Sequence, residues 1–335
     1  KQARAVQRSF TKGDDLAAYN STTGAGAAWV TARPPKACKR GSTARQGLAI
    51  NNEDFQRLWR FRFRGTIVAR PAGVSSDAWR CHRCKKQLDE RADHAFSCPY
   101  MSGLASKRHD AYGAVVSKAA KAADISVSKK NPVVTSLGFA VRPGFTVSVS
   151  GTPGASIAAD LAINPVGDVH TDTSNTLIVD FSSTHPMALT NPTAMGLVVY
   201  GPDETSTEPV KGGRPAGEAA AERAEVKRKH YTAASLIEQE QIVPFAMETY
   251  GYMDKEAVML LRYLAMMRFD RALAANIMAK QQPEEMGAKK RTRMVGYGPV
   301  YRQLLERVAV TQQIGNARML ARYVDCCVNG QACQW

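Results

Sequence analysis

The chain has 335 residues, enough to bury the core of one large domain or of two modest domains. Its 45 Lys and Arg residues exceed its 30 Asp and Glu residues, and the net charge of +15 favours a polyanionic partner, nucleic acid before an acidic membrane surface. No stretch approaches the roughly 18 uninterrupted apolar residues of a membrane-spanning helix, and the first residues are neither a signal peptide nor a translation start. We therefore expect a globular fragment of a longer protein, with no membrane segment.

The seven cysteines form two clusters, with Cys38 alone. An odd and clustered set is a poor match to the disulfide framework of a secreted protein, so we expect a reducing, intracellular compartment. In such a compartment the first cluster is available to bind a metal ion.

Residues 1–56 are rich in small and basic residues with weak periodicity, and we expect them to be weakly structured. A linker of arginines and aromatic residues follows at 57–80. The alternation of arginines with Phe61 and Phe63 suits phosphate pairing with base stacking. It is equally typical of a strand with Trp59, Phe61 and Phe63 facing a core, and both interpretations can hold together. The alternating arginines are Arg60, Arg62 and Arg64.

The clearest motif is C-x2-C-x9-H-x3-C, in which two close pairs of ligands flank a loop long enough to fold back. Three thiolates and one imidazole suit a tetrahedral Zn²⁺, and the ion would be structural because four protein ligands leave no position for water. We expect a small CCHC zinc finger over residues 81–103, because the metal would order a segment too short and polar to fold alone. The predicted zinc ligands are Cys81, Cys84, His94 and Cys98.

Two alternatives to this ligand set stay open, namely three free cysteines beside a chance histidine, and His82 as a rival ligand. The second cysteine cluster has adjacent thiols and no histidine nearby, so it is far less typical of a metal site. Basic side chains on the finger favour contact with nucleic acid, although a finger that joins two domains would look similar. The basic residues are Arg80, Arg83, Lys85 and Lys86, and the second cluster is Cys326, Cys327 and Cys333.

Residues 104–252 have the element order of an α/β core. The order of helix, three strands, helix and strand describes a mixed sheet flanked by helices. A C-terminal helical extension follows at 253–335, with a break expected near Gly315. The patterns predict helices at 104–123, 218–237, 255–280 and 298–324, strands at 145–150, 157–163, 176–182 and 242–247, and polar connections at 124–132 and 185–217.

Two aspartates, Asp160 and Asp180, interrupt apolar strand patterns. Two carboxylates on neighbouring strands would repel each other unless a divalent cation lay between them, and Mg²⁺ prefers such hard oxygen ligands. The helix at 218–237 carries Lys227 and Lys229, and a lysine beside two carboxylates and Mg²⁺ is typical of phosphodiester hydrolysis. Each feature also has an ordinary interpretation, because a strand aspartate can be an edge residue and a charged helix is usually a solvated face.

The order of these motifs resembles the region after the reverse transcriptase of non-LTR retrotransposons that encode a restriction-like endonuclease. The resemblance covers residues 57–325. The segments that carry it are the finger Cys81, Cys84, His94 and Cys98, then Arg108-His109-Asp110, Asp160, Val179-Asp180-Phe181, Lys227 with His230-Tyr231, and residues 244–251, 302–307 and 315–318.

The resemblance implies a PD-(D/E)xK restriction-endonuclease-like core, in which Asp160 and Asp180 hold Mg²⁺ and Lys227 is a catalytic lysine displaced to the following helix. The chain departs from the wider nuclease pattern at Ala159, where proline usually precedes the first aspartate. It departs again at Ser182, where the lysine more commonly lies.

The resemblance further implies a nuclear protein that nicks target DNA to prime reverse transcription. Its partners would be target DNA, element RNA and an upstream reverse transcriptase domain of the same polyprotein. The alternative from another class is a non-catalytic nucleic-acid-binding module that keeps the finger and the fold. A zinc-dependent adaptor that binds protein is disfavoured by the positive charge.

Overall fold

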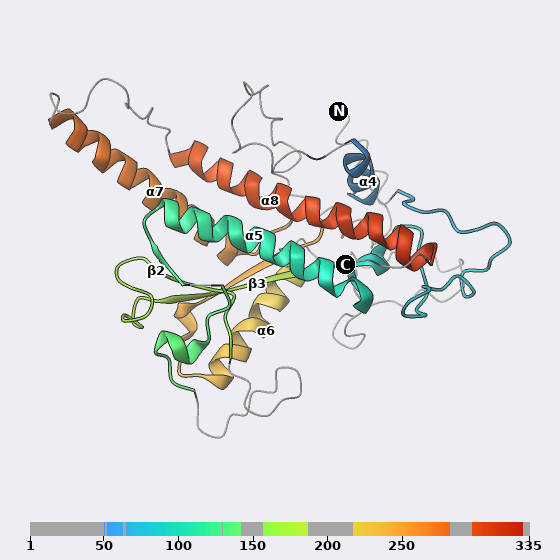
Figure 1. The fold of residues 1–335 in the computed structure, drawn as a ribbon, viewed down its shortest axis with the longest axis horizontal. Coiled ribbons are helices and arrows are strands. Elements are labelled where there is room, and N and C mark those ends of the chain that lie inside the picture. The colour runs from blue at the N-terminus through green and yellow to red at the C-terminus, as the bar shows by residue number, and fades with distance from the viewer. Residues whose placement is uncertain are drawn as a thin grey trace, which may run out of the picture.

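The computed structural model describes residues 50, 52–62, 65–128, 130–141, 157–186, 217–281 and 297–330, with side chains between 217 and 281 described up to residue 271. The strand predicted at 145–150, most of residues 1–56, Arg64 and Cys333 lie outside these ranges. The described residues form a mixed α/β fold with a four-stranded sheet flanked by helices (Figure 1). Within them, no helix combines the length and apolarity that crossing a membrane requires.

The sheet has the strand order β1-β2-β3-β4. The pairs β1–β2 and β2–β3 are antiparallel, and β3–β4 is parallel. A parallel pair needs a long crossover connection, and a helix lies between β3 and β4 in the chain. The strands are β1 (Ser126–Val127), β2 (Leu161–Asn164), β3 (Leu177–Thr184) and β4 (Ile242–Glu248).

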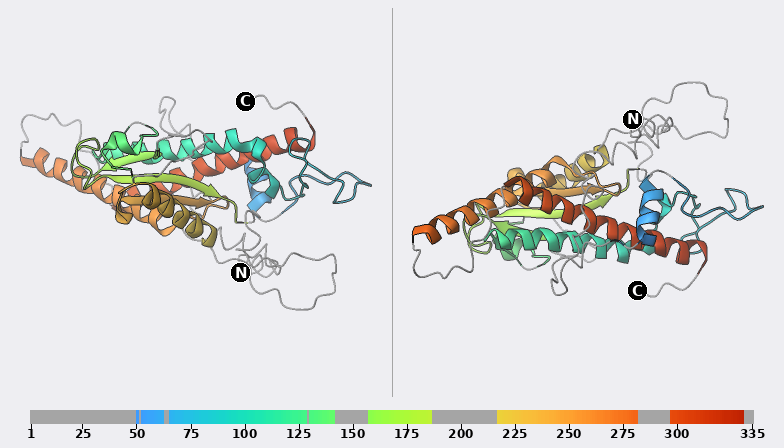
Figure 2. Two further views of the ribbon diagram at one scale, coloured as in Figure 1. Left: turned by 90° about the horizontal axis from the view of Figure 1, so that it is seen from below. Right: turned by 90° about the horizontal axis from the view of Figure 1, so that it is seen from above.

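The helices form layers on both sides of the sheet. Two views at right angles to Figure 1 show α5 and α8 on one side and α6 on the other (Figure 2), while α7 packs against β4 and α8. The helices α5 and α6 and the strands β2, β3 and β4 occur in the predicted order, whereas the first strand of the sheet, β1, does not correspond to the strand predicted at 145–150, which lies outside the described residues. The long helices are α5 (Ser102–Ala122), α6 (Glu218–Ala234), α7 (Lys255–Gln281) and α8 (Tyr297–Arg322).

Short helices connect these elements. The 3-10 helices η3 and η4 lie within residues 81–103, the predicted finger, η5 and η6 lie near the sheet, and the π-helix η7 continues α8. Their bounds are η3 (Asp93–Phe96), η4 (Pro99–Met101), η5 (Val134–Leu137), η6 (Gln239–Gln241) and η7 (Tyr323–Val328).

Each face of the sheet has its own apolar core, as the period-2 pattern of its strands requires. Val179 and Phe181 of β3 pack with α5, α7 and α8, and the same cluster includes the finger cysteines Cys81 and Cys98. Ile178, on the opposite face, packs with Tyr231 of α6. The finger therefore shares a core with the helices on one face of the sheet.

The strand considered for the segment with Trp59 and Phe61 was wrong, because α4 (Asn52–Arg62) occupies it, and Phe63 lies outside the described residues. Leu58 and Phe61 are buried three residues apart, while Trp59 is 42% exposed. This is helical spacing, and an ion pair between Glu53 and Arg57 supports it at i,i+4. The local alternation of Arg and Phe therefore suggested the two-residue period of a strand, although the segment has the period of a helix.

Two further predictions need correction. The connection predicted at 124–132 contains the short edge strand β1, which pairs with β2. The break predicted near Gly315 is absent, since α8 is continuous from Tyr297 to Arg322. A Cβ at Gly315 would lie 2.4 Å from Cγ of Arg108 in α5, so this glycine permits close packing of two helices.

Candidate active site and metal centre

Three thiols and one imidazole converge at the finger. The ligand atoms of Cys81, Cys84, His94 and Cys98 all lie within 4.8 Å of one another, as ligands of one tetrahedral ion must. Cys84 Sγ is 3.1 Å from His94 Nε2, so Nε2 is the ring nitrogen that faces the thiols. The predicted ligand set is therefore brought together, and a cluster of this composition could bind a metal such as zinc.

Backbone hydrogen bonds around the cluster hold the ligands in place. The N–H groups of Arg83 and Cys84 point at Cys81 Sγ, at 3.4 and 3.5 Å. The Asp89 carboxylate accepts the N–H of His94 at 2.9 Å, at the start of the 3-10 helix that carries this histidine. Such outer contacts fix the orientation of metal ligands.

The π-helix η7 closes over the finger. The N–H of His82 donates to Cys327 O at 3.0 Å, and the Tyr323 hydroxyl donates to Asp89 O at 3.1 Å. Cys327 Sγ is 4.0 Å from Cys98 Sγ, so the second cysteine cluster contributes a thiol beside the first. Neither His82 nor Cys327 belongs to the group of four converging ligand atoms.

The register of β2 and β3 places the two predicted acids opposite each other. Leu161 pairs with Val179, so Asp160, the residue before β2, lies opposite Asp180, close enough to affect the pKa of Asp180. Asp160 Oδ2 accepts the N–H of Phe181 at 2.7 Å. The Asp160 carboxylate therefore accepts a backbone N–H of β3 just before the start of β2.

The helix α6 supplies the lysine. Lys227 Nζ donates to Asp180 Oδ1 at 2.7 Å, and the Asp180 side chain is only 5% exposed. Burial raises the pKa of Asp180 to about 6; the Lys227 ammonium opposes this rise and the nearby Asp160 adds to it. Lys229 is exposed and lies 3.6 Å from Glu225. The structure therefore places Lys227, and not Lys229, beside the acids.

His109 of α5 is a site residue for which no role was predicted from the sequence. Its Nε2 is 3.0 Å from both Asp160 Oδ2 and Phe181 O, and since both are acceptors Nε2 carries a proton. Burial lowers the pKa of His109, but the hydrogen bond and charge of Asp160 outweigh this effect and raise it. The motif Arg108-His109-Asp110 was the only signal, and the contact itself spans 51 residues.

A cavity of about 460 Å³ opens beside Asp160 and His109. Its wall is formed by α5 and by Ser128, Lys130 and Asn131, and it is lined by donors such as Lys121 and Lys130. The Asp160 side chain is 24% exposed, in contrast to the buried Asp180. Asp160 is therefore the member of the acid pair that a ligand in this cavity would meet.

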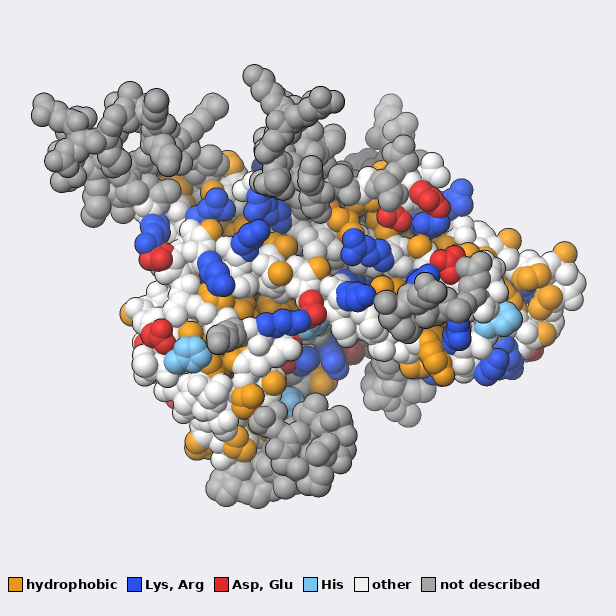
Figure 3. Space-filling view, in the orientation of Figure 1, with side chains coloured by type: hydrophobic (Ala, Val, Ile, Leu, Met, Phe, Trp, Pro, Cys, Tyr) orange, Lys and Arg blue, Asp and Glu red, His pale blue; other side chains and the backbone are white. Residues whose placement is uncertain are grey.

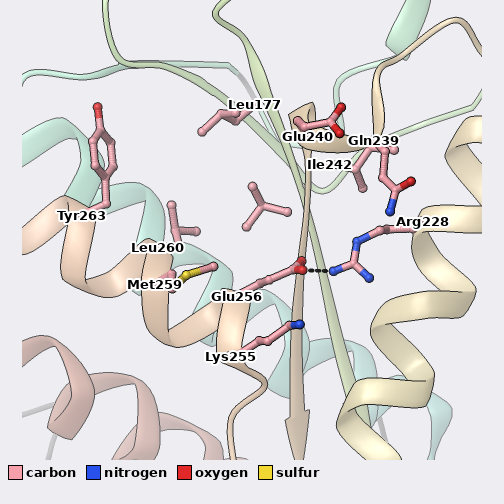
Figure 4. Close-up of a pocket in the computed structure, with 11 residues that line it drawn as sticks. Leu177, Arg228, Gln239, Glu240, Ile242, Lys255, Glu256, Met259, Leu260 and Tyr263 are labelled. Carbon is pink, nitrogen blue, oxygen red and sulfur yellow. Dashed lines mark ion pairs between the residues drawn. The ribbon is translucent and has the colours of Figure 1, made fainter.

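A second cavity, of about 570 Å³, lies between α6, α7 and the start of β4. Figure 4 shows the ion pair of Arg228 with Glu256 beside it, and Met259 and Tyr263 along the α7 side. The cavity lining includes none of the predicted catalytic or metal-binding residues. We assign the ion pair a structural role, because it joins α6 to α7.

The residues predicted to bind nucleic acid differ in exposure. Most of them are exposed, but Arg62 and Arg83 are partly buried, and Arg64 lies outside the described residues. The guanidinium of Arg80 donates to Lys85 O at 3.3 Å, within the finger. The exposed members are Arg60, Arg80, Lys85 and Lys86.

No family model, curated protein or solved structure matches the chain. A function for this chain is therefore inferred from the geometry of the acid pair, the lysine and the four clustered Cys and His residues.

Proposed function

We propose that the chain is a Mg²⁺-dependent DNA endonuclease with a PD-(D/E)xK core and a structural zinc finger. The observation that carries this proposal is the proximity of Asp160, just before β2, to Asp180 of β3, whose carboxylate is paired with Lys227 of α6. The order of elements from α5 to β4 supports it, because it is the order expected for such a core.

The donor set fits a divalent cation. Asp160 and Asp180 would hold it, since two neighbouring carboxylates, one with a raised pKa, gain from a positive charge between them. Mg²⁺, when bound, would supply the charge that polarises the scissile phosphate and promotes ionisation of the attacking water. Lys227 would orient that water or offset charge on the phosphate oxygens. His109 would hold Asp160 in position through its 3.0 Å hydrogen bond.

The biological role follows from the resemblance to non-LTR retrotransposon proteins. The nuclease would nick target DNA in the nucleus, and the nick would supply a 3′ hydroxyl to the reverse transcriptase domain of the same polyprotein. The zinc finger and the basic residues beside it would hold target DNA or element RNA. The exposed Arg60, Arg80, Lys85 and Lys86 would pair with phosphates.

Nicking of supercoiled plasmid tests the proposal. We expect Mg²⁺-dependent conversion to the open circle, and a loss of at least about 100-fold for Asp180→Ala, because removal of a group that acts in the transition state costs rates of this order. The matched control is Asp270→Asn on an exposed turn of α7, which should nick like the unmodified chain. Equal activity of the Asp180→Ala variant would reject the enzyme and leave a non-catalytic nucleic-acid-binding module.

A further inference from the structure

A row of lysines follows the solvent side of α5. Lys107, Lys118 and Lys121 are all exposed, and their positions, eleven and fourteen residues apart, return to the same side of a helix with 3.6 residues per turn. The exposed residues between them, Ala111 and Ala114, are small. No large exposed side chain of α5 therefore lies between these lysines, and their ammonium groups are accessible to solvent.

The neighbouring helix α8 carries a matching row. Arg307 and Arg318 are also eleven residues apart, with Arg318 exposed and Arg307 partly buried. The two helices run side by side in opposite directions (Figure 1), with Arg108 hydrogen-bonded to Asn316. Figure 3 shows Lys and Arg side chains spread across the face on which α5 and α8 lie.

We call this surface the α5–α8 basic face. Among the described residues, none of its five cations forms an ion pair. Two acids, one on α5 and one on η7, are paired with other cations, since Asp110 pairs with Lys130 at 2.7 Å and Asp325 lies 3.9 Å from Arg322. The positive charge of this face is therefore not neutralised by the described residues. Its members are Lys107, Lys118, Lys121, Arg307 and Arg318.

The α5–α8 basic face borders the cavity beside Asp160. Lys121 belongs to the lysine row and also lines that cavity. The cavity lies on one side of the row, and α8 packs against the other side of α5. A polyanion bound along the row would therefore reach the more exposed acid of the candidate active site.

We propose that the α5–α8 basic face binds the phosphate backbone of duplex DNA and leads it to the Asp160 cavity. The statement that the DNA leads to the Asp160 cavity rests on the proposed nuclease function. The proposal adds to that function a DNA-binding surface outside the finger. The opposed helices place Lys107 and Arg318 toward one end of the face and Lys118 and Arg307 toward the other, about 16 Å apart. This separation lets the two ends contact different strands across a major groove about 12 Å wide.

The test is binding of the full chain to a fluorescent DNA duplex of mixed sequence, measured by anisotropy over a range of salt concentrations without Mg²⁺. Lys107→Gln with Lys118→Gln removes one charge at each end. The matched control, Lys255→Gln with Arg302→Gln, removes two charges from exposed positions outside the face. Unchanged melting temperatures of both double variants show that the fold is kept.

We expect the first double variant to bind duplex at least about tenfold more weakly, with the slope of log K against log salt reduced by about 2, because each phosphate contact releases a counterion. The control should stay within about twofold, as expected for cations that contact no phosphate. Equal binding by the two double variants would overturn the proposal, and so would an equal loss for single-stranded DNA of the same length. Since Mg²⁺ is absent, a chain that never nicks DNA could still confirm this surface, and an active nuclease could still refute it.

Discussion

Asp180 is a residue whose chemistry opposes the stability of the fold. Burial raises its pKa to about 6, against about 3.9 in the unfolded chain. Ionised Asp180 therefore lowers the free energy of unfolding by an amount that grows from pH 4 to pH 6 and is on the order of 3 kcal/mol above pH 6. We expect Asp180→Asn to stabilise the metal-free protein by about 1–3 kcal/mol at pH 7 and hardly at all at pH 4, as measured by urea denaturation.

Asp160→Asn is the matched comparison, and it should act with the opposite sign. Burial raises the pKa of Asp160, but hydrogen bonds from His109 and the N–H of Phe181 and the charge of His109 lower it further than burial raises it. A depressed pKa means that ionised Asp160 stabilises the fold above the unfolded pKa, and that this contribution is lost as the pH falls through the folded pKa. The same substitution at the two acids should therefore raise stability at one and reduce it at the other. Stability changes of the same sign at pH 7 would contradict the opposite pKa shifts of the two acids.

Among single residues, the sequence was informative where a side chain broke a pattern. Asp160 and Asp180 interrupt apolar strands, and a buried carboxylate demands a partner. Lys227 follows from the resemblance, and its position on α6 brings it to Asp180. His109 breaks no pattern, because a histidine is ordinary on an amphipathic helix. Its role depends on where α5 crosses the end of the sheet, which no local sequence contains.

At the scale of elements, the contact of α5 with α8 depends on Gly315. A methyl group there would lie 2.4 to 2.9 Å from Cβ, Cγ and Cδ of the buried Arg108. Because these atoms are close to the Arg108 backbone, a change of rotamer cannot relieve the overlap. Overpacking typically costs about 1–3 kcal/mol, more than the roughly 0.5–1 kcal/mol that alanine gains over glycine in a helix. Gly315→Ala should therefore destabilise the protein, with a lower urea midpoint at unchanged m value.

Gly298→Ala, in the first turn of the same helix, is the control for this prediction. A Cβ at Gly298 has no described atom within 4 Å, so only the change in helix propensity remains, and the variant should be as stable as the unmodified chain or slightly more stable. If both alanine variants gained stability, the conclusion that α5 and α8 pack too closely at Gly315 to admit a Cβ would be wrong.

Elements with a strong internal period were predictable, and those defined by a distant partner were not. The helices α5 and α6 and the strands β3 and β4 were predicted within a few residues, because their apolar spacing and flanking polar residues are local. A strand was considered for the segment of α4 because its Arg and Phe residues alternate. In the structure the segment is a helix, whose buried face includes Leu58 and Phe61. Gly315 was predicted to break the helix because glycine is unfavourable in a helix interior. The reason for glycine here is the close approach of Arg108, which lies in another helix and cannot be seen in the local sequence.

At the scale of the whole molecule, the finger and α8 stabilise each other. Cys81 and Cys98 share one apolar core with Leu320 and Tyr323 at the end of α8 and in η7, and η7 is hydrogen-bonded to the finger. A bound metal stabilises only the state that holds its ligands together. Loss of a metal ion held by the four Cys and His residues would therefore loosen the C-terminal end of α8 as well as residues 81–103, although no residue of α8 belongs to that cluster.

Cys84→Ser tests this coupling with little change in packing, because Cys84 is the least buried of the four ligands. We expect the variant to lose its zinc, to melt at least about 5 °C lower, as a loss of a few kcal/mol implies for a domain of this size, and to exchange amide hydrogens faster in η7. Cys327→Ser, at the thiol beside the cluster, should keep one zinc per chain by elemental mass spectrometry. Rapid exchange confined to residues 81–103 would mean that the finger folds independently of α8, and zinc loss from Cys327→Ser would make this cysteine a ligand.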